Sequence, residues 1–256
     1  MIDTHCHLNF ADAFPDPAGA IERAKKNGVG ALIVVGCDEP TSRRALELAE
    51  EHDEVYACIG WHPNYAATFD DTSVAVVEKM ASHPKAVAIG EVGLDYHWNH
   101  ATPELQRRCT LMQLQLAADL GMTAVFHCRD AWDDLLDWLE ADAPRPPRMV
   151  FHCFSGNQEH ARRALKLGGF LGVDGPLTYP KNELLRSIVG NTPQEHILIE
   201  TDSPYLTPHP YRGKPNEPAL LPLVNRALAD ALGISPEECA RVTTDNARAA
   251  FPSLAI

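Results

Sequence analysis

The sequence MIDTHCH at residues 1–7 forms the first predicted β-strand of this chain, and it ends in two histidines one residue apart. Side chains at positions i and i+2 of a strand point to the same face. His5 and His7 can therefore direct two imidazoles at one metal ion, while Cys6 points away. Such a pair alone is a weak signal, because histidines also pair by chance or inside a core. Its meaning depends on whether the other strands supply further ligands.

Seven further short apolar runs follow this strand, and helix-length amphipathic segments separate them. This alternation indicates a parallel sheet with crossover helices. The predicted strands are residues 1–7, 29–36, 55–61, 86–91, 123–127, 149–153, 169–174 and 196–202. The predicted helices between them are residues 17–28, 40–52, 70–83, 102–121, 130–141, 157–168 and 180–191. The fold class is therefore α/β, a (β/α)₈ TIM barrel expected to form one domain over residues 1–256.

A proline-rich loop at residues 203–215 follows the eighth predicted strand, and its prolines exclude a regular helix. Two more helices are expected after it. The last one begins at Ser235, a capping serine, with Pro236 at the first helical position and Glu238 completing a capping box.

The composition is that of an ordinary globular protein. No apolar run approaches the roughly 20 residues that cross a bilayer, and a strand begins at Ile2, so neither a signal peptide nor a membrane anchor is expected. The seven cysteines are scattered, which favours reduced thiols in a cytoplasmic protein. The net charge of −13 disfavours non-specific coating of nucleic acid. It does not exclude a nuclease that grips a strand end, because bound cations carry their own positive field.

Histidines and carboxylates gather where the predicted strands end. In a (β/α)₈ barrel the catalytic groups lie at these C-terminal ends, because the following loops converge on one face. Histidine and carboxylate ligands suit zinc, manganese or iron, and a carboxylate-rich site with open water positions can take magnesium. The residues expected to bind a first divalent cation are His5, His7 and Asp202, and those for a second are His127 and His152, with Glu91 bridging the two.

A bridging carboxylate lets two cations lie about 3.5–4 Å apart, as in two-metal hydrolysis. Water held between the cations would be the nucleophile, and Asp202 would be its general base. Glu91 would otherwise leave an unpaired charge in an apolar strand. The sequence thus predicts two divalent cations, Mg²⁺, Mn²⁺ or Zn²⁺, with Asp202, Glu91 and His62 as catalytic residues.

These residues lie in motifs that together resemble the TatD family of metal-dependent hydrolases, within the amidohydrolase-like barrels, over nearly the whole chain. The motifs are DTHCHL at 3–8, GWHP at 60–63, GEVGLD at 90–95, HCRDA at 127–131, HCFSG at 152–156, ETDSPYL at 200–206 and RGKPN at 212–216. The resemblance implies a two-metal site with these ligands. It also implies a deoxyribonuclease activity that in several members removes nucleotides from the 3′ end.

Two departures from the family pattern stand out. The sequence YHW occupies residues 96–98, where members more often carry tyrosines followed by arginine, and Thr110 replaces a usual helix phenylalanine. Loss of that arginine could weaken or redirect phosphate binding.

Several of these residues have alternative interpretations. His62 could orient a ligand, contact substrate or cap its strand; we expect substrate contact, because six ligands already fill the metal pair. Asp202 could merely cap a turn, but its position opposite His5 and His7 around the barrel favours ligation. Strand alternation turns the cysteines at 6, 128 and 153 away from the site, so they are expected to be small hydrophobes. Asp95 and His97 receive no role.

Substrate contacts are expected from the loops of the catalytic face. Arg129, Arg212 and Lys214 are candidates for gripping phosphate, and Arg129 ranks first because its fork can bind two oxygens. Tyr205 could stack on a base or pack its own loop.

The predicted function is a divalent-metal-dependent hydrolase, a 3′–5′ exodeoxyribonuclease acting on single-stranded 3′ ends of DNA or a related oligonucleotide. The protein is expected to be a cytoplasmic monomer without a membrane partner. Two alternatives remain open: an ester hydrolase of the same superfamily, for example on aminoacyl-tRNA, and a catalytically silent binding barrel with structural metals. Against the second, structural metal sites usually close their coordination sphere.

Overall fold

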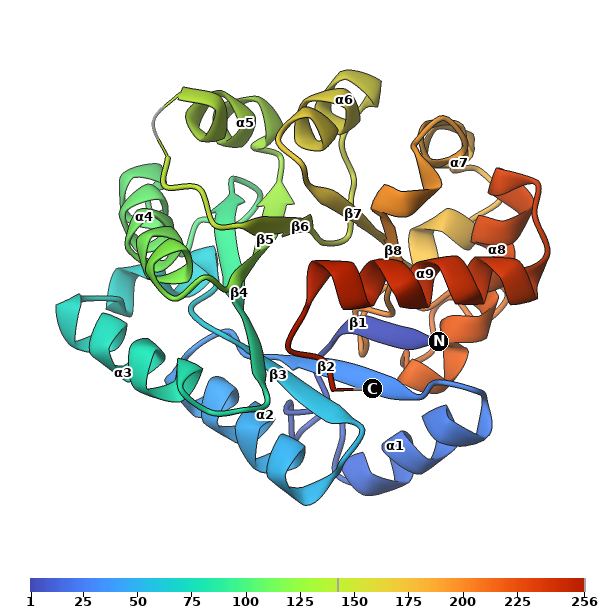
Figure 1. Ribbon diagram of the computed structural model, residues 1–256, viewed down its shortest axis with the longest axis horizontal. Coiled ribbons are helices and arrows are strands. Elements are labelled where there is room, and N and C mark those ends of the chain that lie inside the picture. The colour runs from blue at the N-terminus through green and yellow to red at the C-terminus, as the bar shows by residue number, and fades with distance from the viewer. Residues whose placement is uncertain (142, 256) are drawn as a thin grey trace.

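A computed structural model describes residues 1–141 and 143–255. Eight parallel strands lie in sequential order around one sheet, as predicted. They are β1 (Ile2–Cys6), β2 (Ala31–Val35), β3 (Val55–Ile59), β4 (Ala86–Asp95), β5 (Thr123–Arg129), β6 (Arg148–Phe151), β7 (Phe170–Val173) and β8 (Ile197–Ile199). A bridge between Cys6 and Ser203 joins the first strand to the segment that follows the last one, so the sheet curls into a nearly closed barrel (Figure 1). The predicted (β/α)₈ fold is confirmed.

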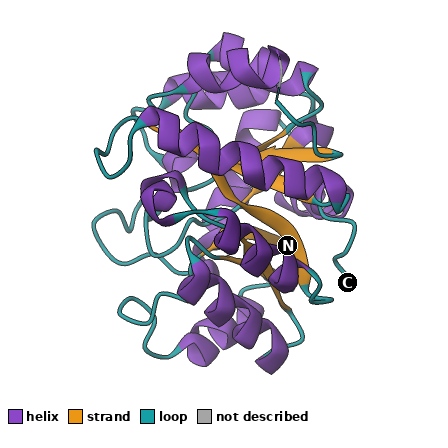
Figure 2. Ribbon diagram, turned by 90° about the vertical axis from the view of Figure 1, so that its left-hand side faces the viewer, coloured by secondary structure: helices purple, strands orange, loops and turns teal. Residues whose placement is uncertain are grey.

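Helices surround the barrel and cover its outer face (Figures 1 and 2). They are α1 (Pro17–Lys26), α2 (Glu39–Glu51), α3 (Asp71–Ala81), α4 (Pro103–Asp119), α5 (Trp132–Ala141), α6 (Gln158–Lys166), α7 (Glu183–Gly190), α8 (Leu221–Leu232) and α9 (Pro236–Ala250). Short 3₁₀ helices occupy Pro63–Thr68, Gly175–Thr178, Gln194–His196 and Pro218–Leu220. Helix α9 begins at Pro236 as predicted, and the Ser235 side chain accepts a hydrogen bond from the backbone N–H of Glu238. The Glu238 side chain does not complete the predicted capping box, because its carboxylate accepts hydrogen bonds from Arg241. Among the described residues, no helix is long and apolar enough to cross a membrane.

The apolar core has two layers, one on each side of the sheet. The outer layer packs strand residues such as Leu32 and Ile59 against the helices. The inner layer fills the barrel with residues of the opposite strand face, such as Ile33, and ends on Phe251, which follows α9 and is fully buried. This arrangement follows from the alternation of side chains along each strand.

Helix α9 closes one end of the barrel. The Thr123 hydroxyl donates a hydrogen bond to the Ala250 carbonyl (2.6 Å), and the Asn246 amide donates to the Ile197 carbonyl (2.8 Å). Thr123 and Ile197 are the first residues of their strands, so α9 covers the N-terminal ends. The C-terminal ends of the strands, where ligands were predicted, remain accessible.

Several strands end at other residues than predicted, and three of these differences move a proposed ligand relative to its strand. β4 continues to Asp95, so Glu91 lies inside a strand rather than at its end. β8 ends at Ile199, which leaves Asp202 in the following loop with a left-handed φ of 51°. β6 ends at Phe151, one residue before His152. The longer β4 has a physical reason: its register with β5 shifts between Gly90 and Val92, and pairing then resumes.

Gly93 of β4 pairs with His127 of β5. Its φ is 137°, and an added Cβ would lie 1.9 Å from the His127 carbonyl oxygen. We expect Gly93→Ala to lower the free energy of unfolding by about 3 kcal/mol or more, measured by urea denaturation.

The matched control for this change is Gly121→Ala. Gly121 also has a positive φ, 66°, but a Cβ there would meet no described atom within 4 Å. Only the backbone cost of about 1–2 kcal/mol is expected. Equal losses in the two variants would show that contact with β5 is not what requires glycine at position 93.

Candidate metal centre

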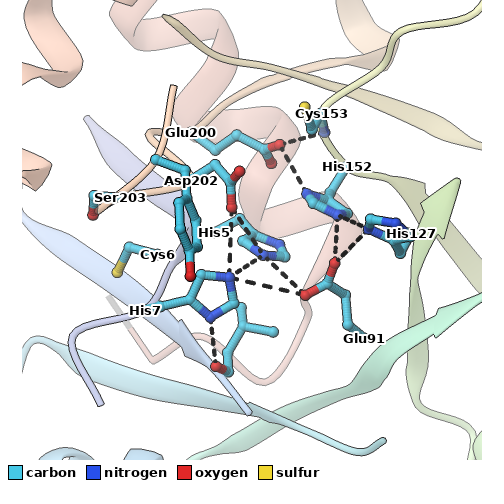
Figure 3. A network of polar contacts seen from close by, with 12 residues as sticks. His5, Cys6, His7, Glu91, His127, His152, Cys153, Glu200, Asp202 and Ser203 are labelled. Atoms are coloured by element: carbon cyan, nitrogen blue, oxygen red, sulfur yellow. Dashed lines mark hydrogen bonds and ion pairs between the residues drawn. The ribbon is translucent and has the colours of Figure 1, made fainter. Parts of the chain in front are cut away.

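The predicted ligands converge on a cavity of about 1000 Å³ at the C-terminal mouth of the barrel. The predicted site residues that line it are His7, His62, Glu91, His127, Arg129, His152, Asp202 and Tyr205. His5 lies beneath them and is fully buried. Figure 3 shows the Glu91 carboxylate between the His5 and His7 rings on one side and the His127 and His152 rings on the other.

The first group of potential ligands surrounds a small volume next to β1. His5 Nε2 lies 3.3 Å from His7 Nε2, 3.5 Å from Glu91 Oε2 and 3.7 Å from Asp202 Oδ1. His7 Nε2 lies 3.5 Å from Asp202 Oδ1 and 3.9 Å from Glu91 Oε2. Ligands about 2.1 Å from a tetrahedral ion are separated by about 3.4 Å. The His5, His7 and Asp202 atoms therefore have the spacing of ligands around one cation, and Glu91 Oε2 lies near both imidazoles.

The second group lies on the other side of Glu91. Glu91 Oε1 is 2.6 Å from His152 Nε2 and 3.0 Å from His127 Nδ1, and these two nitrogens are 3.4 Å apart. The distances to Glu91 are hydrogen-bond distances, so a proton occupies these contacts in the metal-free protein. A cation would take the place of such a proton. One carboxylate thus presents one oxygen to each group.

Hydrogen bonds on the far sides of two rings set which nitrogen faces the cavity. His7 Nδ1 lies 2.9 Å from the Val35 carbonyl, which can only accept, so His7 donates there and Nε2 is the nitrogen that faces the first group. His127 Nε2 lies 2.9 Å from Asp95 Oδ2, which leaves Nδ1 toward Glu91. Backbone and carboxylate partners of this kind orient metal-binding histidines in proteins.

The remaining two rings have a free nitrogen. Among the described residues, His5 Nδ1 and His152 Nδ1 are buried without a hydrogen-bond partner. Glu200 approaches His152 Nδ1 to 3.6 Å while it accepts a hydrogen bond from the Cys153 backbone N–H (2.6 Å). Glu200 thereby holds the turn after β6 against β8 and keeps His152 in place.

The electrostatics of the centre favour positive charge. Burial alone would raise the pKa of Glu91, but the surrounding histidines, His152 above all, outweigh it and hold that pKa well below its ordinary value. Burial alone would lower the pKa of His152, yet Glu91 and Glu200 raise it well above the ordinary value. Burial alone would also lower the pKa of His127, but its hydrogen bonds with Asp95 and Glu91 raise it. Protons therefore supply the positive charge that a bound cation would otherwise provide.

His62 differs from these histidines. Burial, followed by the charge of His127, lowers its pKa to about 3, so the ring is neutral. Its Nδ1 accepts a hydrogen bond from the Asn64 backbone N–H (3.0 Å), which places the ring proton on Nε2. Nε2 lies 3.7 Å from Glu91 Oε1 at the cavity wall. A protonated Nε2 is a hydrogen-bond donor and not a metal ligand.

Asp202 owes its position to the contacts of its own backbone. Its N–H donates to the His5 carbonyl (2.9 Å), and the neighbouring Thr201 N–H donates to Asp3 Oδ1 (2.9 Å). Asp202 is 8% exposed and lines the cavity. Burial alone would raise the pKa of its carboxyl, but contacts with His7 and His5 lower it, so Asp202 is ionised.

The three cations expected to bind phosphate are not brought together. Arg129 lines the cavity, as does Tyr205, whose side chain is half exposed. The Arg212 guanidinium instead lies 4.6 Å from the Tyr179 ring centre, and Lys214 Nζ lies 5.6 Å from that of Tyr211. Neither is among the described residues that line the cavity. The sequence placed these side chains on the correct loops but could not show which way they point.

Sequence reasoning missed other residues of the cavity wall. Cys37 follows β2 and has its sulfur within 4.8 Å of ligand atoms of His7 and Glu91. Its place directly after a predicted strand was an available signal. Cys153 was expected to face away, but it lines the cavity with a φ of 44°, because β6 has already ended and strand alternation no longer applies. Cys6, by contrast, is buried in the outer core layer as expected.

Asp95 is predicted to strengthen cation binding through His127. We expect Asp95→Asn to weaken the affinity for a divalent cation about tenfold, because an amide holds the ring less strongly than a carboxylate. Isothermal titration of the metal-free protein measures this. Asp130→Asn is the matched control, since Asp130 contacts His97 from an exposed position on the next loop. Equal affinities in the Asp95 and Asp130 variants would contradict the assignment.

Cation binding is predicted to release protons near neutral pH. The pKa values of His7, His127 and His152 are all raised, so these rings keep protons above the pH at which an ordinary histidine loses them. A cation competes for the same nitrogens, so its affinity should rise with pH and level off once the rings are deprotonated. Titrations between about pH 6 and 9, with an indicator for released protons, test this. An affinity that does not change with pH would contradict it.

Comparison with known proteins places the chain in a family. A family model described as TatD related DNase matches residues 2–252. An uncharacterized metal-dependent hydrolase, YabD, of Bacillus subtilis (strain 168) is 39% identical over 251 residues, which cover 98% of each chain. A 3'-5' ssDNA/RNA exonuclease TatD of Musicola paradisiaca (strain Ech703) is 35% identical over 98% of this chain and 97% of that protein.

The crystal structure of YJJV, a TatD homolog from Escherichia coli K12, has the same fold. It matches with a TM-score of 0.91 and 32% sequence identity over 98% of each chain. The resemblance seen in the sequence motifs is therefore confirmed. The chain belongs to the TatD related DNase family of metal-dependent hydrolases.

Proposed function

We propose that this protein is a 3′–5′ exonuclease of single-stranded nucleic acid that works with two divalent cations. One observation carries the proposal: Glu91 is 2% exposed and offers Oε2 to His5 and His7 and Oε1 to His127 and His152. A carboxylate that spans two groups of histidines is the arrangement expected of a bridging ligand. The first cation would be held by His5, His7 and Asp202, and the second by His127 and His152.

The chemistry and placement of the residues fit such cations, although Glu91 and His152, 2.6 Å apart, would have to separate to bind the second one. The first group has the ligand spacing of a tetrahedral ion, and two of its rings keep a buried nitrogen facing it. The mixture of imidazole and carboxylate suits Zn²⁺ or Mn²⁺, and open positions toward the cavity would allow Mg²⁺. The cavity leaves both groups accessible, unlike a closed structural metal site.

The chemistry divides among the residues around the cavity. Two divalent cations bound there would lower the pKa of a water molecule and neutralise charge on the phosphoryl oxygens. Asp202, ionised at the cavity wall, would take the proton of the attacking water. The neutral His62 would donate its Nε2–H to a phosphate or leaving-group oxygen. Arg129 would bind a neighbouring phosphate at two oxygens.

Two observations support a single-stranded substrate. A cavity of about 1000 Å³ is large enough for one or two nucleotides but is a recess, so a chain end enters it more easily than a duplex. Several relatives that match nearly the whole chain carry the name 3'-5' ssDNA/RNA exonuclease TatD. The net charge of −13 disfavours binding of nucleic acid over a large surface. It agrees with binding of the strand end by the bound cations and Arg129 alone.

An assay of metal-free protein restored with Mg²⁺, Mn²⁺ or Zn²⁺ tests the proposal. We expect cleavage of single-stranded DNA or RNA from the 3′ end. A strand labelled at its 3′ end should release a labelled mononucleotide at once, and a strand labelled at its 5′ end should give a ladder of progressively shorter products. A phosphorothioate at the last 3′ linkage should block the ladder. An aminoacyl ester serves as the competing substrate. Cleavage of the ester alone would overturn the nuclease proposal, and no turnover on any substrate would indicate a binding barrel.

The role of Asp202 is tested by Asp202→Asn. Loss of a positioned general base is expected to lower kcat by about 10²–10⁴-fold. Metal content, measured on the same sample, shows whether both cations remain. Asp119→Asn, at the exposed end of α4, is the matched control. A near-normal rate in Asp202→Asn with both cations bound would refute the assignment.

A further inference from the structure

Hydrogen bonds hold the first three residues of the loop after β4, residues 96–98. The backbone N–H groups of His97 and Trp98 donate to Asp95 Oδ1 at 2.9 and 3.1 Å. The Tyr96 N–H donates to the Arg129 carbonyl (2.9 Å), and its hydroxyl donates to Asp134 Oδ2 (2.9 Å). A loop bound in this way loses little conformational freedom when a ligand binds to it.

Trp98 projects from this fixed loop into the cavity wall. Its side chain is 50% exposed, whereas Trp61 and Trp132 are 6% and 7% exposed. The fold therefore gains little from this indole. The Arg129 guanidinium lies 5.9 Å from the indole ring, and the His100 ring is stacked near it, with ring centres 6.0 Å apart. A large exposed aromatic next to a cation in a cavity is a typical element of a ligand site.

We propose that Trp98 is a stacking platform for one nucleobase of the substrate strand, with Arg129 binding the phosphate next to that base. This proposal rests on the proposed exonuclease function and adds a subsite to it. An indole stacks on every base, which suits an enzyme that shortens strands of any sequence. The planar guanidinium, which lies over the indole ring, matches the phosphate that adjoins each base in a strand.

Asp95 links this subsite to the metal centre. Its Oδ1 accepts the two N–H groups that hold the Trp98 loop, while its Oδ2 holds the His127 ring. A base stacked on Trp98 is therefore held at a set position relative to His127. The subsite would thus control how far the strand end reaches into the cavity.

Tyr205 lies on the other side of the centre. Its ring centre is 6.3 Å from that of His7, in the first ligand group, whereas Trp98 belongs to the side of His127. Trp98 and Tyr205 thus approach the centre from different loops, and the exposed Tyr65 lines the same cavity. A strand that passes over both groups would place one base against Trp98 and leave Tyr205 for another.

The test uses the full-length, metal-loaded protein and a tetranucleotide whose phosphorothioate linkages resist hydrolysis. Stacking should quench tryptophan fluorescence in the wild type. The quench should disappear in Trp98→Phe, which keeps most of the affinity, and remain in Trp138→Phe, because Trp138 is partly buried on α5. An oligonucleotide of abasic sites, which keeps the phosphates, should bind without quenching.

Kinetics give the second readout. Trp98→Ala should raise the KM for oligonucleotide cleavage roughly 5- to 100-fold, the loss expected for one stacked base, and change kcat less. Leu111→Ala, on the exposed face of α4, should leave both unchanged. Suppose that the wild type cleaves strands. Quenching that persists in Trp98→Phe, or an unchanged KM in Trp98→Ala, would then refute the stacking proposal and leave the proposed function standing. If the wild type cleaves no nucleic acid, the proposed function fails as well.

Discussion

The buried carboxylate of Glu91 is the constraint on which the mouth of this barrel depends. Removing an ionised carboxylate from water costs several kcal/mol, and only nearby positive charge and hydrogen bonds offset that cost. Glu91 obtains them from His5, His7, His127 and His152, which come from three different parts of the barrel. The strands therefore have to end at heights that bring these rings to one carboxylate. Protons satisfy this demand in the metal-free protein, and the proposed cations would satisfy it better.

Two carboxylates near the mouth each connect two structural elements by using both oxygens. Glu91 faces one histidine pair with each oxygen, and Asp95 holds a loop with one and the His127 ring with the other. Because each carboxylate contacts two partners, the position of one partner depends on that of the other. The wall of the cavity, the proposed ligands and the loop with Trp98 are thus one connected network. The stabilisation of the fold comes mainly from elsewhere, in the apolar layers below.

The separation of stability from chemistry follows from the barrel itself. The N-terminal end is closed by α9 and Phe251, which bury apolar area at the base of the inner core layer. The opposite end carries buried polar groups that would each be costly without partners. The apolar packing at the closed base fixes the positions of the strands. The polar groups at the opposite ends therefore do not have to stabilise the fold. Gly93, paired with His127, shows how closely β4 and β5 approach each other at the site.

The sequence by itself determined the eight strands, their parallel order and the kinds of side chain at their ends. The hydrophobic periodicity predicts which residues are buried, and histidines within apolar runs indicate the position of the functional site. Only the tertiary structure decided that β4 runs past Glu91, that Cys153 turns into the cavity, and that Arg129 lines it while Arg212 and Lys214 pack on tyrosines. These features depend on register shifts, on left-handed turns and on contacts between loops. Such contacts join residues far apart in the chain, so no local pattern records them.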